Sequence, residues 1–99
     1  MSKITTRMKR LVRHVLKDED PTIWVGKEGL TPQLTGEIEK QLQRNKMVKV
    51  RILPAAMQGE VMAQAIAANA AEQTNAALVE VRGHVFILFR KRKAEEPSE

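Results

Sequence analysis

The chain has 99 residues, of which 42% are apolar and 29% are charged, and it carries a net charge of +5 at pH 7. This length suits one domain with one core and excludes a two-domain enzyme. The sequence contains no cysteine, which excludes disulfide scaffolds, thiolate zinc sites and cysteine nucleophiles. No stretch approaches the roughly 18 apolar residues of a membrane span, so we expect a soluble, cytoplasmic protein.

The positive charge is concentrated in the first 93 residues. Three of the twelve acids, Glu95, Glu96 and Glu99, lie in the last six residues, so residues 1–93 carry 17 basic and nine acidic side chains. We therefore predict one folded domain over residues 1–93 and an acidic, disordered tail over residues 94–99. Such a basic domain suggests nucleic acid or an anionic membrane surface as a partner, although surface charge can also serve solubility alone.

The first predicted element is an amphipathic helix over residues 8–17, with Thr5 or Thr6 as the N-cap candidate. Apolar residues recur there at helical spacing, at Met8, Leu11, Val12, Val15 and Leu16. The remaining faces carry a cationic series without an intervening acid: Arg7, Lys9, Arg10, Arg13, His14 and Lys17. A charged helix face is usually only solvated, but like charges at this spacing repel, so a polyanion that neutralises them is the alternative we favour.

A glycine loop follows the second predicted element, a short strand over residues 22–25. Gly26, Lys27, Glu28 and Gly29 form a GxxG sequence in which backbone N–H groups and the lysine can approach a phosphate. Glycine also serves purely structural turns between strand and helix, and Glu28 would repel a phosphate unless it points away. The loop lacks the Gly-Lys-Ser or Gly-Lys-Thr ending of the phosphate-binding loop in nucleotide-binding proteins. It also lacks the third glycine of the motif that binds dinucleotides.

A second helix and strand follow the glycine loop. Thr31 and Pro32 are typical of the N-cap and first position of a helix, which we expect to run to about Arg44, with Asn45 in the left-handed position after it. Residues 48–53 then alternate as a half-buried strand whose outer face is basic, with Lys49 and Arg51.

The last predicted elements are an alanine-rich helix over residues 59–73 and a hairpin with strands over residues 77–81 and 84–90, joined by Arg82-Gly83. The order α-β-α-β-α-β-β, with right-handed crossovers, indicates an α/β (α+β) two-layer sandwich with a mixed four-stranded sheet whose last two strands are antiparallel.

Catalytic and metal chemistry have little support in the sequence. His14 and His84 lack metal-ligand spacing, and no nucleophile and base or paired carboxylates are recognisable. We therefore expect no enzyme activity, no metal and no cofactor. The aromatic residues are Trp24, Phe86 and Phe89. All three lie in apolar strand contexts and at least two are expected in the core, so base stacking cannot be the main source of affinity.

The segments VGKEGLTPQLTGEIEKQL, NKMVKVRIL and TNAALVEVRGHVFILFRKRK resemble the CRM (chloroplast RNA splicing and ribosome maturation) domain family in its single-domain, YhbY-like form. The resemblance extends from about Leu11 to Arg92. Pro32 and Asn75 stand where relatives commonly have other residues, but each suits its position in a helix start or a left-handed turn. The resemblance implies a fold similar to the C-terminal domain of translation initiation factor three.

The resemblance also implies RNA binding without catalysis, in assembly of the large ribosomal subunit. Gly26, Lys27, Glu28 and Gly29 match the loop proposed to contact the RNA backbone, and Leu30 and Thr31 match the two positions after it. Arg10, Arg13 and Lys17 correspond in character only. We expect a monomer that binds structured RNA, ribosomal RNA or a precursor particle of the large subunit. The alternatives are a dimeric, Alba-like architectural DNA- or RNA-binding protein and, with less support, a small enzyme acting on phosphate-containing ligands.

Overall fold

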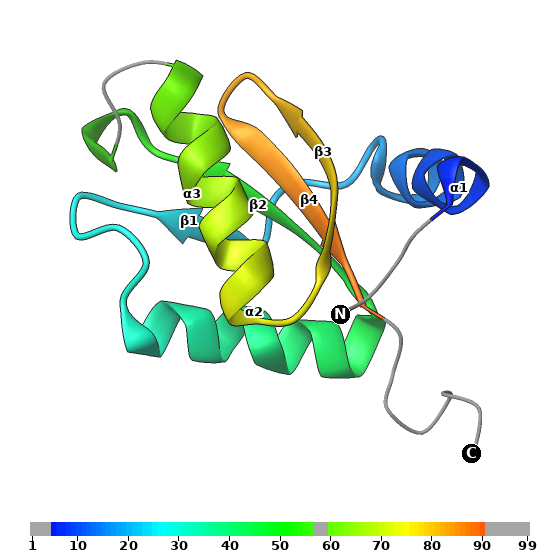
Figure 1. Cartoon of the computed structure of the whole chain (residues 1–99), viewed down its shortest axis with the longest axis horizontal. Coiled ribbons are helices and arrows are strands. Elements are labelled where there is room, and N and C mark those ends of the chain that lie inside the picture. The colour runs from blue at the N-terminus through cyan, green and yellow to red at the C-terminus, as the bar shows by residue number, and fades with distance from the viewer. Residues whose placement is uncertain (1–4, 57–59, 91–99) are drawn as a thin grey trace.

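The computed structural model of the chain describes residues 5–56 and 60–90. It contains three α-helices, one short 3-10 helix and four strands in the predicted order (Figure 1). The helices are α1 (Thr6–Leu16), α2 (Pro32–Asn45) and α3 (Glu60–Gln73), and the 3-10 helix is η1 (Pro54–Ala56). The strands are β1 (Ile23–Val25), β2 (Met47–Ile52), β3 (Ala77–Arg82) and β4 (Val85–Phe89).

The predicted helix caps are confirmed, while two turns differ by one residue. The hydroxyls of Thr5 and Thr31 each accept the backbone N–H three residues later, at 3.1 Å. The left-handed residue after α2 is Lys46 (φ 70°) and not Asn45, because the helix continues one residue further than predicted. Arg82 pairs with Val85, so the hairpin turn is Gly83-His84 and not Arg82-Gly83; Gly83 supplies its positive φ of 58°.

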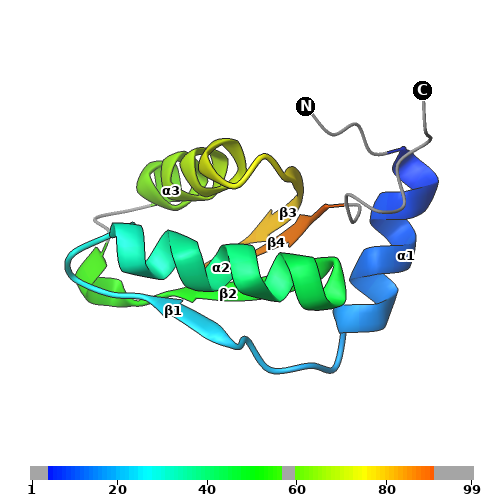
Figure 2. The same cartoon turned by 90° about the horizontal axis from the view of Figure 1, so that it is seen from below.

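The sheet has the strand order β1-β2-β4-β3, with β1 and β2 parallel and the other neighbours antiparallel. This confirms the predicted mixed four-stranded sheet. Helices α2 and α3 lie together on one face of it (Figure 2). The main core fills the space between them with the buried alternate residues of the strands, among them Val48, Val50, Phe86 and Leu88. Ala63, Ala67 and Ala70 of α3 are almost fully buried, and their small size allows α3 to pack closely on the sheet.

Helix α1 packs on the opposite face of the sheet, at the end formed by the β3–β4 hairpin, so helices cover both faces there. The predicted two layers are therefore three at this end of the sheet, because β4 carries apolar side chains on both faces. Val12 is buried there with Val79, Ile87 and Phe89, and β4 therefore buries both of its faces. The predicted apolar stripe of α1 packs on the sheet along one row only, in which Val12 is buried and Met8 and Leu16 are partly buried. Leu11 and Val15 are about half exposed. Because α1 packs against only part of a sheet face, a narrower stripe of its surface is buried than in a helix that lies in a central layer.

An irregularity in β3 brings two side chains to the face of α1. The register between β3 and β4 shifts between Leu78 and Glu80, so Val79 joins the cluster under α1 while Glu80 pairs with Ile87 on the same face. Residues 91–93, at the end of the predicted domain, and the predicted acidic tail 94–99 lie outside the described residues. In the described part of the chain, no helix has the length and apolar character needed to cross a membrane.

Candidate nucleic-acid interface

The GxxG loop connects the end of β1 to the start of α2. The backbone N–H of Gly29 donates to the carbonyl oxygen of Gly26 at 2.9 Å, which closes a tight turn. Gly29 has a φ of 72°, in the left-handed region that favours glycine. A Cβ added at Gly26 or Gly29 would meet no atom within 4 Å, so the outer side of the loop is open. Packing inside the protein therefore does not require a glycine at Gly26, whereas the backbone conformation favours one at Gly29.

The six loop residues predicted to contact RNA divide into two groups. Lys27 and Glu28 are exposed, and they line a shallow hollow of about 320 Å³ with Gly26, Gly29, Thr31, Leu34 and Trp24. Leu30 packs against the main core, and the Thr31 hydroxyl caps α2. Leu30 and Thr31 thus anchor the loop, while Lys27 and Glu28 project their charges from it.

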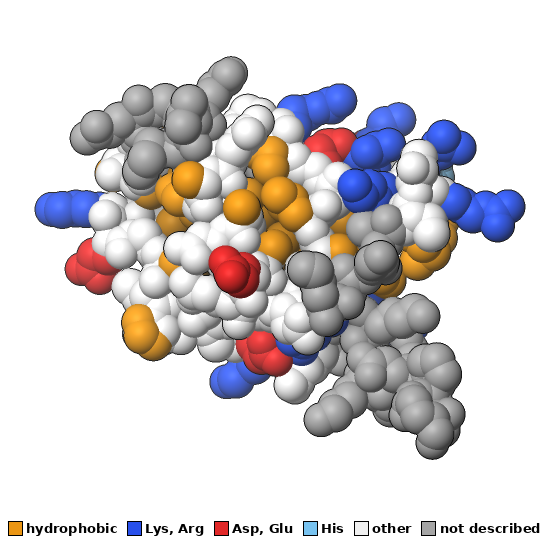
Figure 3. All heavy atoms as spheres, in the orientation of Figure 1, with side chains coloured by type: hydrophobic (Ala, Val, Ile, Leu, Met, Phe, Trp, Pro, Cys, Tyr) orange, Lys and Arg blue, Asp and Glu red, His pale blue; other side chains and the backbone are white. Residues whose placement is uncertain are grey.

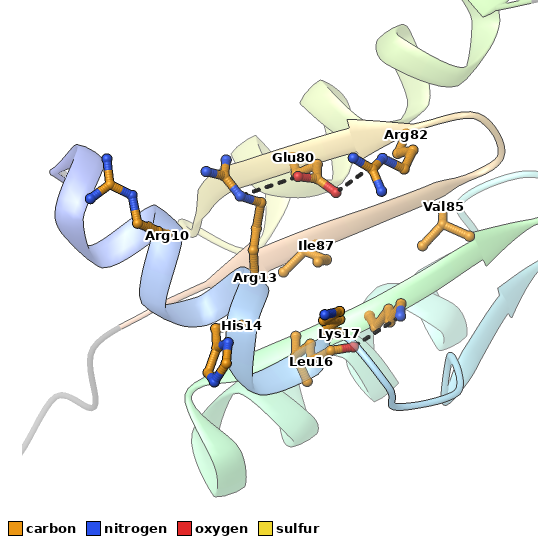
Figure 4. Close-up of a pocket in the computed structure, with 10 residues that line it drawn as sticks. Arg10, Arg13, His14, Leu16, Lys17, Glu80, Arg82, Val85 and Ile87 are labelled. Carbon is orange, nitrogen blue, oxygen red and sulfur yellow. Dashed lines mark hydrogen bonds and ion pairs between the residues drawn. The ribbon is translucent and has the colours of Figure 1, made fainter.

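A second, larger hollow lies between α1 and the sheet, and we call it the α1 groove (Figure 4). Its volume is about 430 Å³. One wall carries the predicted residues Arg10, Arg13 and Lys17, together with His14. The other side is formed by Lys49 of β2 and by Glu80, Arg82, Val85 and Ile87 of the hairpin. The structure thus brings the three predicted helix residues together around a partly apolar floor and adds Arg82 to them.

The cationic charge of the α1 groove is partly offset by Glu80. Arg13 Nε lies 3.4 Å from Glu80 Oε1, and Arg82 Nε lies 3.9 Å from Glu80 Oε2. Helix α1 carries no acid of its own, but β3 supplies one, so the prediction of an uncompensated helix face is only partly right. Arg82 has 86% of its side chain exposed and Arg13 has 41%, and such solvent-exposed pairs are weak. Both guanidinium groups can therefore exchange Glu80 for another anion.

Two further basic residues have structural roles. The Lys49 ammonium donates to the carbonyl oxygens of Leu16 at 3.0 Å and Glu19 at 2.8 Å, at the C-terminal end of α1, where a cation complements the helix dipole. Arg90 lies on the other side of the molecule, where it donates to the Thr74 carbonyl oxygen at 2.6 Å and pairs with Glu39 at 2.9 Å. The sequence pattern placed Lys49 on a basic outer strand face, and it gave no signal of the long-range contacts of either residue.

The loop and α1 lie at opposite ends of the molecule (Figure 1). In the space-filling view, Lys and Arg side chains gather around α1 and the neighbouring hairpin (Figure 3). Four residues on neighbouring strands lie side by side on one face of the sheet and connect the two ends. Trp24 pairs with Arg51, Arg51 with Val85, and Val85 with Arg82. We call them the cross-strand row. Trp24 lines the loop hollow, and Val85 and Arg82 line the α1 groove, so one sheet face joins both hollows.

The prediction that at least two of the three aromatic residues lie in the core is confirmed. Phe86 and Phe89 are buried, but Trp24 is 52% exposed. Ile23 and Val25 of β1 are buried, and the alternation of a strand turns Trp24, which lies between them, to the opposite face. That face is open at β1 because α1 covers the sheet only at its β3–β4 end. Among the described residues, no three His, Asp or Glu side chains gather in a group that could hold a metal ion.

Comparison with known proteins decides the family. The model of the CRS1 / YhbY (CRM) domain matches residues 4–90. The chain belongs to the CRM domain family. This CRM domain is 37% identical over 91 residues to a Methanocaldococcus jannaschii protein named "probable RNA-binding protein", with 92% of the chain covered and 66% of that relative. It is 28% identical to a protein of Haemophilus influenzae named "RNA-binding protein", with 91% of the chain and 88% of that relative covered.

The fold of this CRM domain also has a solved counterpart. The solution structure of a Staphylococcus aureus protein, described as a candidate RNA-binding protein, superposes with a TM-score of 0.78 and covers 95% of each chain. The sequence identity is 23%, so this likeness concerns the fold alone. The predicted family and fold are confirmed, whereas the predicted RNA contacts of individual residues stay predictions.

Proposed function

We propose that this CRM domain is a non-catalytic RNA-binding protein that binds structured RNA as a monomer, and specifically precursor RNA of the large ribosomal subunit. The observation that carries the proposal is the α1 groove, in which cationic side chains from a helix and from the hairpin converge. Its relatives are named RNA-binding proteins, which supports RNA over other polyanions. The restriction to ribosomal RNA rests on the resemblance to stand-alone CRM proteins, which implies assembly of the large subunit.

The proposed contacts are mainly to the RNA backbone. Arg10, Arg13, Lys17 and Arg82 bind phosphates along the α1 groove, and guanidinium groups suit phosphate oxygens because they donate two parallel hydrogen bonds. Lys27 and the backbone N–H groups of the open GxxG loop, other than that of Gly29, which donates to Gly26, bind a second stretch of phosphates. Contacts of this kind position an RNA without reading its sequence, so selectivity comes from the shape of the RNA and from its 2′-hydroxyl groups.

The test is a competition between RNA and DNA at equal salt. A structured fragment of large-subunit precursor RNA is titrated with the full chain, and duplex DNA of matched charge is added as competitor. The proposal expects RNA to be preferred and the affinity to fall linearly with salt on a double logarithmic plot, with a slope set by the number of phosphates neutralised. A preference for duplex DNA, together with a stable dimer in sedimentation, would instead support the Alba-like alternative.

A further inference from the structure

Trp24 is exposed at a position where the fold has no need of a tryptophan. Its neighbours in β1, Ile23 and Val25, are 2% and 0% exposed, whereas Trp24 is 52% exposed. An indole is a large apolar group that is highly buried on average in folded proteins. In this chain it lies on the face of β1 opposite to that of Ile23 and Val25, which belong to the main core. The exposed ring therefore adds little to the core and is available to a ligand.

Charged side chains lie near Trp24, and the other large hydrophobic residues exposed in the part of the chain that the structure describes, Leu11 and Val15, lie on α1. Arg51, its partner in the parallel pairing of β1 and β2, is exposed on the same face. On the side of the loop, Trp24 lines the hollow that also contains Lys27 and Glu28. A protein partner would be expected to need a contiguous apolar surface. One aromatic ring between cationic side chains is instead typical of surfaces that bind single-stranded nucleic acid.

The cross-strand row gives the ligand a direction. Adjacent strands are about 4.8 Å apart, so Trp24 lies about 14 Å from Arg82 across the three spacings of the row. Arg51 lies between them and Arg82 lines the α1 groove. A single RNA strand that leaves the α1 groove can therefore cross the open sheet face, pass Arg51 and reach Trp24 beside the GxxG loop.

We propose that Trp24 is a stacking platform for one unpaired base of the bound RNA, with Arg51 and Lys27 holding the phosphates on either side of that base. The inference rests on the proposed function and adds a binding residue that backbone contacts alone do not require. Loss of a ring that stacks on one base is expected to weaken binding by about 5-fold to 100-fold.

The chain contains a single tryptophan, so its fluorescence reports on this position alone. The experiment titrates the full chain with a single-stranded oligoadenylate and, separately, with inorganic polyphosphate. Stacking predicts that oligoadenylate quenches the fluorescence with the same midpoint as binding measured by anisotropy of the labelled oligonucleotide. Polyphosphate has no bases, so it is expected to bind and leave the fluorescence nearly unchanged.

Variants separate stacking from a structural role. Trp24→Leu keeps an apolar side chain on β1 and is expected to bind oligoadenylate about tenfold more weakly, whereas Trp24→Phe keeps a stacking ring and is expected to restore most of the affinity. Leu11→Ala is the matched control, because Leu11 is equally exposed at 54% but lies on α1. Circular dichroism and thermal unfolding verify that each variant is folded.

The outcomes distinguish this inference from the proposed function. If oligoadenylate binds with the expected salt dependence but without quenching, and Trp24→Leu binds as tightly as the unmodified chain, the stacking inference is wrong and the proposed function stands. If neither oligoadenylate nor the structured precursor RNA binds, the proposed function fails and the inference fails with it. If Trp24→Leu changes self-association in sedimentation and leaves RNA affinity unchanged, Trp24 is a contact between copies, which also overturns the inference.

Discussion

At the residue scale, Lys27 is the exposed cation of the GxxG loop, and its role can be tested by charge reversal. We predict that Lys27→Glu weakens binding of the precursor RNA fragment by about tenfold at low salt and lowers the salt slope by about one. The reason is the loss of one phosphate contact and the addition of a repelling carboxylate. Lys40→Glu is the matched control, because Lys40 is an exposed residue of α2 and the change in net charge is the same.

The binding isotherms of the two variants decide this prediction. A Lys27→Glu variant that binds as tightly as Lys40→Glu would show that net charge matters and that the loop does not contact RNA. A larger effect of Lys27→Glu at low salt that disappears at high salt is the expected pattern, because exposed charges are increasingly screened as ionic strength rises.

The two loop glycines allow a second test at this scale, because they differ in backbone conformation. Gly29→Ala is expected to lower the free energy of unfolding by about 1 kcal/mol, since an alanine is strained at a φ of 72°. Gly26→Ala is expected to change it by less than about 0.5 kcal/mol, because an added Cβ meets no atom and the backbone there is not left-handed. Urea unfolding of both variants measures the difference.

The RNA affinity of Gly26→Ala then tests the loop directly. If RNA phosphates approach the backbone at Gly26, the added methyl group weakens binding even though the variant is as stable as the unmodified chain. Unchanged affinity in a fully stable Gly26→Ala variant would mean that the glycine serves neither folding nor close approach of RNA, and would leave Lys27 as the main contact of the loop.

At the scale of elements, the position of α1 depends on a contact with β2 that is distant in sequence. Lys49 holds the C-terminal end of α1 through two carbonyl oxygens. We predict that Lys49→Met costs about 1 kcal/mol of stability and also weakens RNA binding, because the wall of the α1 groove loosens. Hydrogen exchange of the α1 amides measures the loosening, and Lys40→Met is the control. Unchanged exchange in α1 would contradict this role of Lys49.

The sequence predicted the elements well where the cause is local. The structure confirms the helix caps at Thr5 and Thr31 and the start of α2 at Pro32. It also confirms the alternating burial of Val48, Val50 and Ile52. All of these features depend on residues that are neighbours in the sequence. Which sheet face α1 covers depends on the strand order, which the spacing of residues along the chain does not encode. For the same reason the burial of the apolar stripe of α1 was overestimated at Leu11 and Val15.

The candidate site was predictable in its composition but not in its contacts. The loop and the basic helix were visible as residue types. The pairing of Arg13 with Glu80 arises from the shifted register in β3, and the exposure of Trp24 arises because β1 is an edge strand on an open face. Both are consequences of tertiary structure, so a sequence pattern could at most have indicated that Trp24 alternates with two core residues.

At the scale of the whole molecule, the loop and the α1 groove lie at opposite ends of one face and are joined by the cross-strand row. One variant combines Arg10→Gln with Lys17→Gln in the α1 groove, and a second carries Lys27→Glu in the loop. We predict that their effects on the free energy of binding to the long precursor fragment add when all three changes are combined, because distant sites act independently. Arg13 is left unchanged in this variant, since its removal would also leave Glu80 without its nearer partner.

Short RNA distinguishes the two surfaces from each other. An oligonucleotide that is too short to reach from the groove to the loop should respond to only one of the two changes, while the long fragment responds to both. Anisotropy measurements on a series of RNA lengths reveal the length at which the second change begins to matter. Equal responses of the shortest and longest RNA to both changes would contradict a path across the open face.

The most direct test of the account is crosslinking in living cells, followed by sequencing of the RNA attached covalently to this protein. We predict that the attached RNA is enriched in precursor RNA of the large ribosomal subunit, and that Lys27→Glu combined with Arg10→Gln and Lys17→Gln reduces its recovery. Crosslinks spread evenly over unrelated RNAs and DNA, at a level insensitive to these changes, would contradict it and leave a fold without the proposed ribosomal role.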